Sequence, residues 1–172
     1  MPSHPNIVAI DAILGKSQSS VVRDFLRYMR QIHPPGHLPA RRDFDMAALP
    51  HLLANIVLVE VERKPAPQPA RFFVRVAGEA VLDAAPSPMM NRYIDEIVAT
   101  NTRLSGRDAG VILDVRQQVL STGVTYYWHG PPRMKFRHDY ADLEYVHCPL
   151  ADDGITIDRI ISAFYYEGAV PL

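Results

Sequence analysis

The sequence predicts an α+β domain in which a five-stranded antiparallel sheet is flanked by helices, and two observations indicate this class. First, a helix-like run over residues 108–122 ends at Gly123 and leads into three strand-like runs. These late runs span 124–129, 143–151 and 155–167. Second, a proline-rich loop joins an earlier pair of strand-like runs, over 56–62 and 71–77. A chain of 172 residues is long enough to bury such a core as one domain.

Residues 1–37 are expected to form an N-terminal helical extension. After Ser19, which can cap a helix, apolar residues recur at spacings of three and four. This helix must end near His33, because the following Pro-Pro-Gly cannot continue it. Its apolar stripe comprises Val21, Val22, Phe25, Leu26 and Met29. The stripe needs an apolar partner, which is either the sheet of the same chain or the same helix of a second subunit.

Residues 38–168 are expected to form the main domain. It begins with a connector of short helical turns over 39–53, in which Asp45 can cap a turn. Along the second strand, alternation places three apolar residues on one face: Phe72, Val74 and Val76. Two short helices are predicted next, over 81–85 and 93–104. The buried stripe of the long helix is expected to comprise Val111, Ile112, Val115, Val119 and Leu120. The turn over 152–154, Asp-Asp-Gly, joins the last two strands.

Several short segments carry a resemblance to a known family. They are LPARRDFD (38–45), LPHLL (49–53), FFVRVAG (72–78), NRYIDEI (91–97) and CPLADDG (148–154). In this order, within the pattern of two strands, short helices, a long helix and three strands, they resemble the stand-alone bacterial PAS-domain family common in alphaproteobacteria. The resemblance covers residues 38–166. It implies a PAS-like sheet that encloses a small-molecule cavity against its short helices, regulation through partner contacts, and an N-terminal helix used in dimers.

Strand phase, together with this resemblance, indicates a ligand-binding site lined by apolar, aromatic and histidine side chains. Its expected residues are Phe72, Val74, Tyr93, Ile97, Tyr127, His129, Tyr145, His147 and Phe164. For any one aromatic residue, packing in the core is the more common role. A small planar ligand suits such a site, but the sequence identifies neither the ligand nor a cofactor.

Metal and catalytic motifs are not found in the sequence. The histidines show no recognised metal-ligand spacing, and His147 and Cys148 point to opposite faces of a strand, so no metal site is expected. No cysteine precedes His147, and no histidine lies between Leu52 and Trp128. These gaps disfavour the flavin–cysteine and histidine–haem chemistry known for PAS domains. There is also no nucleophile elbow or phosphate loop, so we expect a non-catalytic protein.

The net charge and the apolar content of the sequence indicate which kinds of partner the protein can bind. The formal net charge of −1 provides no basic footprint for nucleic acid. No run approaches the roughly 18 apolar residues of a membrane span, and the first residues do not form a secretory signal. The sequence therefore predicts a cytoplasmic protein that binds neither nucleic acid nor membrane.

The leading hypothesis is a PAS-like sensory or regulatory module, expected to be a homodimer, that binds a small ligand or a regulatory protein partner and signals through protein–protein contacts. Two alternatives stay open. One is a small-molecule enzyme whose polar residues His129, His147 and Arg92 converge in the cavity. The other is a ligand-free dimerisation adaptor with a filled core.

Overall fold

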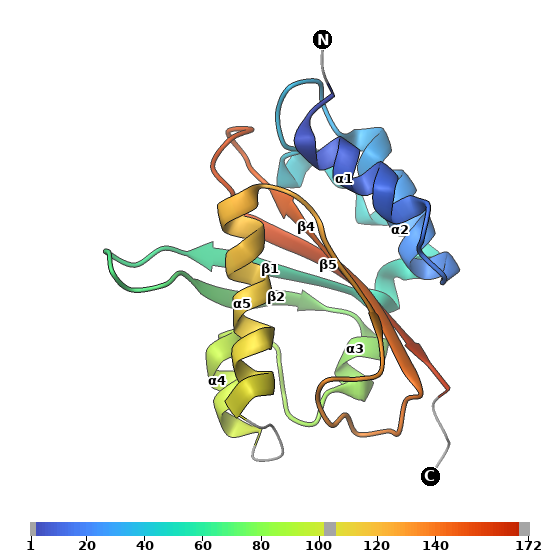
Figure 1. Cartoon of the computed structure of the whole chain (residues 1–172), viewed down its shortest axis with the longest axis vertical. Helices are drawn as coiled ribbons and strands as arrows, with labels where there is room; N and C mark the ends of the chain where they lie inside the picture. The colour runs from blue at the N-terminus through green and yellow to red at the C-terminus, as the bar shows by residue number, and fades with distance from the viewer. Residues whose placement is uncertain (1–2, 102–105, 169–172) are drawn as a thin grey trace.

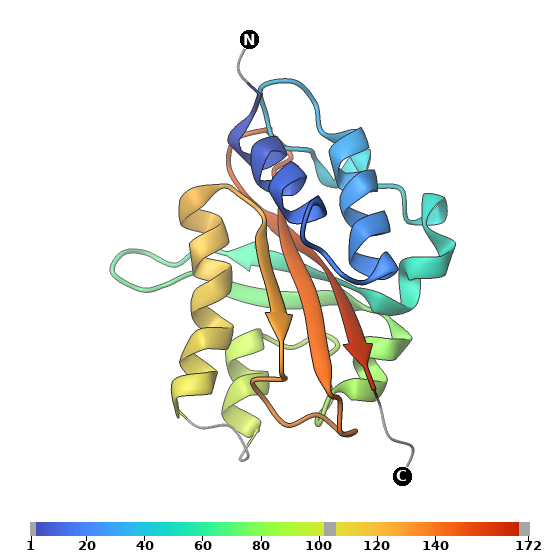
Figure 2. The ribbon, with the colours of Figure 1, turned by 45° about the vertical axis from the view of Figure 1, so that its right-hand side comes forward.

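Five antiparallel strands form one sheet in the order β2-β1-β5-β4-β3 in the computed structural model, which describes residues 3–101 and 106–168 (Figure 1). The strands are β1 (Ile56–Glu62), β2 (Arg71–Ala77), β3 (Tyr126–Gly130), β4 (Asp142–Leu150) and β5 (Arg159–Glu167). Helices flank both faces of this sheet (Figures 1 and 2). The expected α+β class with a five-stranded antiparallel sheet is therefore confirmed.

The last strand begins later than predicted, at Arg159 rather than at residue 155. The cause is Asp153, whose carboxylate Oδ1 accepts hydrogen bonds from the backbone N–H groups of Ile155 and Thr156 at 2.8 and 2.6 Å. These N–H groups are thereby withdrawn from the strand ladder, and the connection between β4 and β5 becomes longer than a three-residue turn.

Strand β2 contains a β-bulge that the alternating pattern does not predict. Leu58 pairs with Val76 and Val59 with Val74, so Arg75 is the extra residue on β2. Phe72 and Val74 pack on one face of the sheet, whereas Val76 packs on the other. The expectation that all three share a face is therefore wrong for Val76, because the bulge shifts the side-chain phase by one residue.

Two N-terminal helices, α1 (Pro5–Leu14) and α2 (Ser20–Ile32), lie over one face of the sheet (Figure 2). Ser19 caps α2 as expected, because its hydroxyl accepts from the backbone N–H of Val22 at 3.1 Å. Most of the predicted stripe is fully buried against the sheet of the same chain: Val22, Phe25, Leu26 and Met29; Val21 is partly buried beside them. The four fully buried side chains of the stripe therefore pack against the chain's own sheet, and Val21 stays partly exposed at its edge.

The opposite face of the sheet is covered by three helices: α3 (Glu79–Ala84), α4 (Ile94–Thr100) and α5 (Gly106–Thr122). The predicted helix over 93–104 ends earlier, at Thr100, because Asn101 leaves the helical region at ψ 88°; residues 102–104 lie outside the described residues. Helix α5 ends at Thr122, and the next residue, Gly123, has a positive φ of 67°, the left-handed conformation that glycine adopts readily.

Three short 3₁₀ helices connect α2 to β1, as the connector pattern predicts. They are η1 (Arg41–Asp43), η2 (Met46–Ala48) and η3 (Pro50–Asn55). Asp45 caps the second of them by accepting from the backbone N–H of Ala47. Across the described ranges, no helix combines the length and apolar character needed to cross a membrane.

Candidate ligand-binding cavity

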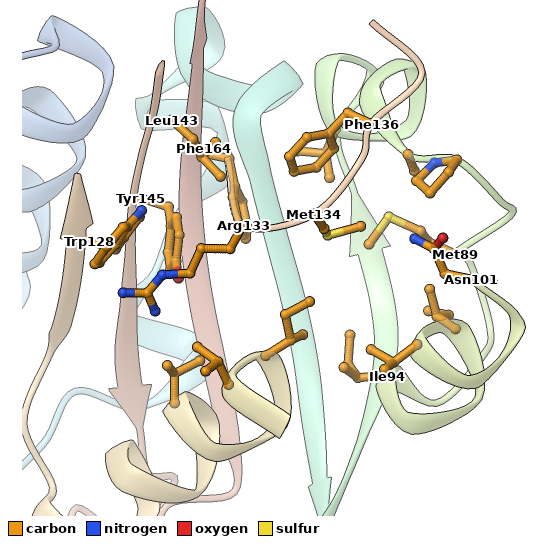
Figure 3. A pocket seen from close by; sticks show the side chains of 18 of the residues that line it. Met89, Ile94, Asn101, Trp128, Arg133, Met134, Phe136, Leu143, Tyr145 and Phe164 are labelled. Carbon is orange, nitrogen blue, oxygen red and sulfur yellow. The ribbon is translucent and has the colours of Figure 1, made fainter. Parts of the chain in front are cut away.

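A cavity of about 120 Å³ lies between the sheet and helices α3, α4 and α5, and the connection from β3 to β4 closes part of it (Figure 3). Its lining is mostly apolar and aromatic and includes Ile97, Val115, Met134, Phe136, Tyr145 and Phe164. An engineered protein cavity of roughly 150 Å³ with a similar apolar lining binds benzene. The cavity therefore has room for a ligand about the size of one aromatic ring.

The pleat of β4 and its pairing build the aromatic wall of the cavity. Tyr145 and His147 are two residues apart and face the cavity, whereas Cys148 faces α1 and α2, as predicted for alternating positions. Tyr145 pairs with Trp128 on β3 and with Phe164 on β5. Because directly paired side chains share a face, the three rings line one wall, with the Tyr145 and Phe164 centroids 5.3 Å apart.

His147 is fully buried in this wall. Its Nδ1 lies 2.6 Å from the hydroxyl of Ser162 on β5, and its ring stacks on Tyr126. Burial, and next the charge of Arg116 on α5, hold the pKa of His147 well below its usual range. The imidazole is therefore neutral near pH 7, and it adds a polar atom but no positive charge to the cavity.

The buried imidazole makes stability depend on pH. Since His147 takes up a proton in the unfolded chain at pH 6.5 and below but not in the folded chain, stability is lost as the pH falls below 6.5. We expect a slope of about 1.4 kcal/mol per pH unit from this residue. The measurement is urea unfolding between pH 7 and pH 5 for the wild type, for His147→Phe and for the surface control His51→Phe. An unchanged slope in His147→Phe would assign the acid sensitivity to other histidines.

Arg116 is the buried positive charge of the cavity. It belongs to α5, is only 5% exposed, and lines the cavity together with Ile112 and Val115. Its Nη1 donates to the backbone carbonyl of Ile112 at 3.2 Å, whereas its buried Nε has no hydrogen-bond partner. Within the described part of the chain, no carboxylate forms an ion pair with it. Burial lowers the pKa of Arg116 to about 10, so the guanidinium is still charged at neutral pH.

Trp128 and Arg133 also line the cavity, and they contact each other. The guanidinium of Arg133 lies over the Trp128 ring, 3.3 Å from its centroid, and Figure 3 shows it reaching toward Tyr145 as well. The indole Nε1 of Trp128 is buried and has no hydrogen-bond partner. Because the chain contains a single tryptophan, its fluorescence reports directly on this cavity.

Part of the predicted site is brought together here. Ile97, Tyr145, His147 and Phe164 all line the cavity. Phe72 and Val74 pack in the core on the same face of the sheet but outside the lining. Tyr93 is also outside it, where its hydroxyl donates to Glu62 and Arg71 stacks on its ring at 3.7 Å.

Tyr127 and His129 lie on the opposite face of the sheet from the cavity. The Tyr127 hydroxyl donates to Glu144 at 3.1 Å, and His129 lies 3.3 Å from Asp142. Their neighbours Tyr126 and Trp128 face the cavity side instead. The predicted phase of β3 is thus off by one residue, and such an error moves every side chain of a strand to the other face.

The polar residues proposed for an enzyme do not converge. Only His147 lines the cavity; His129 lies on the other face, and Arg92 donates to the carbonyl of Pro88 at 2.8 Å outside the cavity. Throughout residues 3–101 and 106–168, no group of three or more His, Cys, Asp or Glu side chains is placed to hold a metal ion.

Sequence reasoning missed Arg116, although a signal for it exists. Arg116 follows Ile112 by four residues and precedes Val119 by three, so helical spacing places it on the buried stripe of α5. An arginine within an apolar stripe indicates a buried charge that needs a partner.

Comparison with known proteins assigns no family. No known family profile matches the chain, and no curated protein matches it. Among solved structures, the chain is similar to an IcIR transcriptional regulator from Alicyclobacillus acidocaldarius, with 10% sequence identity and a TM-score of 0.30. The similarity covers 97% of this chain and 65% of that regulator's length. Likeness at this level does not establish a shared fold, so the functional argument rests on the cavity.

Proposed function

We propose that the protein is a PAS-like, non-catalytic regulatory module that binds a small molecule in the cavity and signals through contacts with other proteins. The observation that carries this proposal is an apolar cavity of about 120 Å³ between the sheet and the helices α3 to α5. A cavity at this place is what the resemblance to PAS domains implies. The order of two strands, two short helices, a long helix and three strands further supports it.

The cavity also favours this function over the two alternatives, a dimerisation adaptor and an enzyme. An adaptor that acts only by dimerising needs a filled core, and open space between sheet and helices argues for an occupant instead. An enzyme built on His129, His147 and Arg92 would need these side chains around one substrate, and they lie apart.

The connection between β3 and β4, over 131–141, is the segment best placed to report an occupied cavity. Its residues Arg133, Met134 and Phe136 line the cavity. The same connection contacts α3 on the outside, because the N–H of Arg137 donates to the carbonyl of Ala84 at 2.9 Å. In our proposal, ligand contact repositions this segment and thereby changes a surface that a regulatory partner, or a second copy of the chain, recognises.

Filling the cavity tests the proposal. We expect Val115→Phe to place a ring in the space that a ligand needs and to abolish ligand binding while the fold persists. The measurement is native mass spectrometry of protein isolated from its own cells, compared with the denatured mass. The wild type should carry a small molecule that Val115→Phe lacks.

The matched control is Val8→Phe on the exposed side of α1, which should keep the bound molecule. Thermal unfolding of both variants verifies that they fold. A small molecule retained equally by Val115→Phe would place its site elsewhere and contradict the proposal.

A further inference from the structure

The buried charge of Arg116, which has no carboxylate partner among the described residues, points to the chemistry of a ligand for this cavity. A guanidinium removed from water loses several kcal/mol of solvation, which an opposite charge at hydrogen-bond distance normally offsets. Arg116 is 5% exposed, yet its hydrogen bond to the Ile112 carbonyl leaves Nε without a partner. The described residues supply no carboxylate to the cavity lining. An anionic molecule in the cavity would supply the counter-charge that these residues lack.

The cavity lining contains hydrogen-bond donors without partners, which such a molecule could satisfy. Arg116 Nε and Trp128 Nε1 are both buried polar atoms without a hydrogen-bond partner, and both groups can only donate. His147 already has Ser162 as a partner and carries no positive charge near neutral pH. Two buried donors without partners on residues of one cavity lining, together with the fixed positive charge of Arg116, favour a ligand whose acceptor atoms are negatively charged.

The charge of the cavity lining and the volume of the cavity further limit the chemical class of the ligand. The buried guanidinium of Arg116 neutralises one negative charge. The second guanidinium of the lining, Arg133, is partly exposed and screened by water, so it compensates the second charge of a phosphate dianion only weakly. A carboxylate matches the planar fork of arginine and can accept two hydrogen bonds from it. The remaining lining is apolar and aromatic, and about 120 Å³ accommodates roughly one ring or a short branched chain.

We propose that the cavity binds a small monocarboxylic acid, with its carboxylate on Arg116 and its apolar or aromatic body against Tyr145 and Phe164. This inference rests on the proposed function, because it names the ligand class of the same cavity. Arg116 is the binding residue that selects anions. Arg133, which is partly exposed and stacked on Trp128, adds a weaker positive potential at the side of the cavity.

Benzoate and its neutral isostere benzamide test the charge requirement. Both are titrated into the full chain at pH 7 while the fluorescence of Trp128 and the thermal midpoint are followed. We expect benzoate to bind at least about 10-fold more tightly than benzamide, since hydrogen bonds to a charged partner are the stronger ones. Arg116→Met should weaken benzoate about 10- to 100-fold and change benzamide less than about 3-fold.

Two further variants keep the test decisive. Arg133→Met removes the partly exposed guanidinium and should weaken benzoate clearly less than Arg116→Met does. Arg116→Lys retains the charge without the planar fork and should bind benzoate with an affinity between those of the wild type and Arg116→Met, even if the methionine variant fails to fold.

The outcomes distinguish the carboxylate assignment from the proposed ligand-binding function on which it rests. Equal binding of benzoate and benzamide to the wild type, or unchanged benzoate binding in the Arg116 variants, overturns the carboxylate assignment but leaves a ligand-binding cavity in place. Failure of both probes to bind, with no molecule retained in native mass spectrometry, overturns both.

Discussion

Replacing Phe25 with alanine is expected to lower the free energy of unfolding by about 3–5 kcal/mol, because the ring is fully buried between α2 and the sheet. It packs near the ring of Phe44, with the centroids 6.1 Å apart. Truncation removes this apolar surface and leaves a cavity that a tightly packed core cannot fill by relaxation. Urea unfolding, followed by circular dichroism, measures the loss.

The control for Phe25→Ala is Val8→Ala on α1. Val8 is 57% exposed, so its truncation should change the stability by no more than about 0.5 kcal/mol. Solution mass, measured by light scattering, distinguishes the two expected roles of the α2 stripe. A Phe25→Ala protein of unchanged stability but half the solution mass would mean that the stripe packs against a second subunit rather than against its own sheet.

Sequence patterns predict those features of the fold that depend on neighbouring residues, such as strand bounds and helix caps. The bounds of β1 and β2 follow from two runs rich in β-branched and aromatic residues, which lie on either side of a proline-rich loop; Gly78 follows the second run. The start of α2 follows from the capping hydroxyl of Ser19. The face of Val76 does not follow, because the bulge at Arg75 is defined only by pairing with β1, and pairing is not a local property.

The cavity illustrates the same limit. Alternation along one strand places Tyr145 and His147 on the same face, and both line the cavity. Their partners on β3 depend on the register, which sets Tyr126 opposite His147 and Trp128 opposite Tyr145. The three consecutive aromatic residues from Tyr126 to Trp128 do not by themselves show which face of β3 meets the cavity, because large aromatic side chains point to both faces. Arg116 is different: its position is local information, but its burial without an acid becomes evident only when the surrounding elements are in place.

The largest polar effect is expected at Glu144, where alanine should cost about 3–5 kcal/mol of unfolding free energy. Glu144 lies on β4, is 2% exposed, and faces the N-terminal helices. Its Oε1 accepts from the backbone N–H of Gln18 at 2.8 Å and from the Tyr127 hydroxyl at 3.1 Å. Its Oε2 accepts from the N–H of Ser19 at 2.6 Å. The carboxylate thus holds the start of α2 to the sheet, and a negative charge is favourable at that end of a helix.

Matched variants separate the backbone contacts of Glu144 from its contact with Tyr127. Tyr127→Phe removes one hydrogen bond and should cost about 1 kcal/mol. Glu144→Gln keeps one acceptor oxygen but places an amide N–H₂ against a backbone donor, so its cost should lie between those of Tyr127→Phe and Glu144→Ala. Hydrogen exchange at the amides of Gln18 and Ser19 should accelerate in both Glu144 variants and stay slow in Tyr127→Phe. Equal costs for Glu144→Ala and Tyr127→Phe would show that the backbone bonds do not hold α2, and that the buried carboxylate serves mainly the tyrosine.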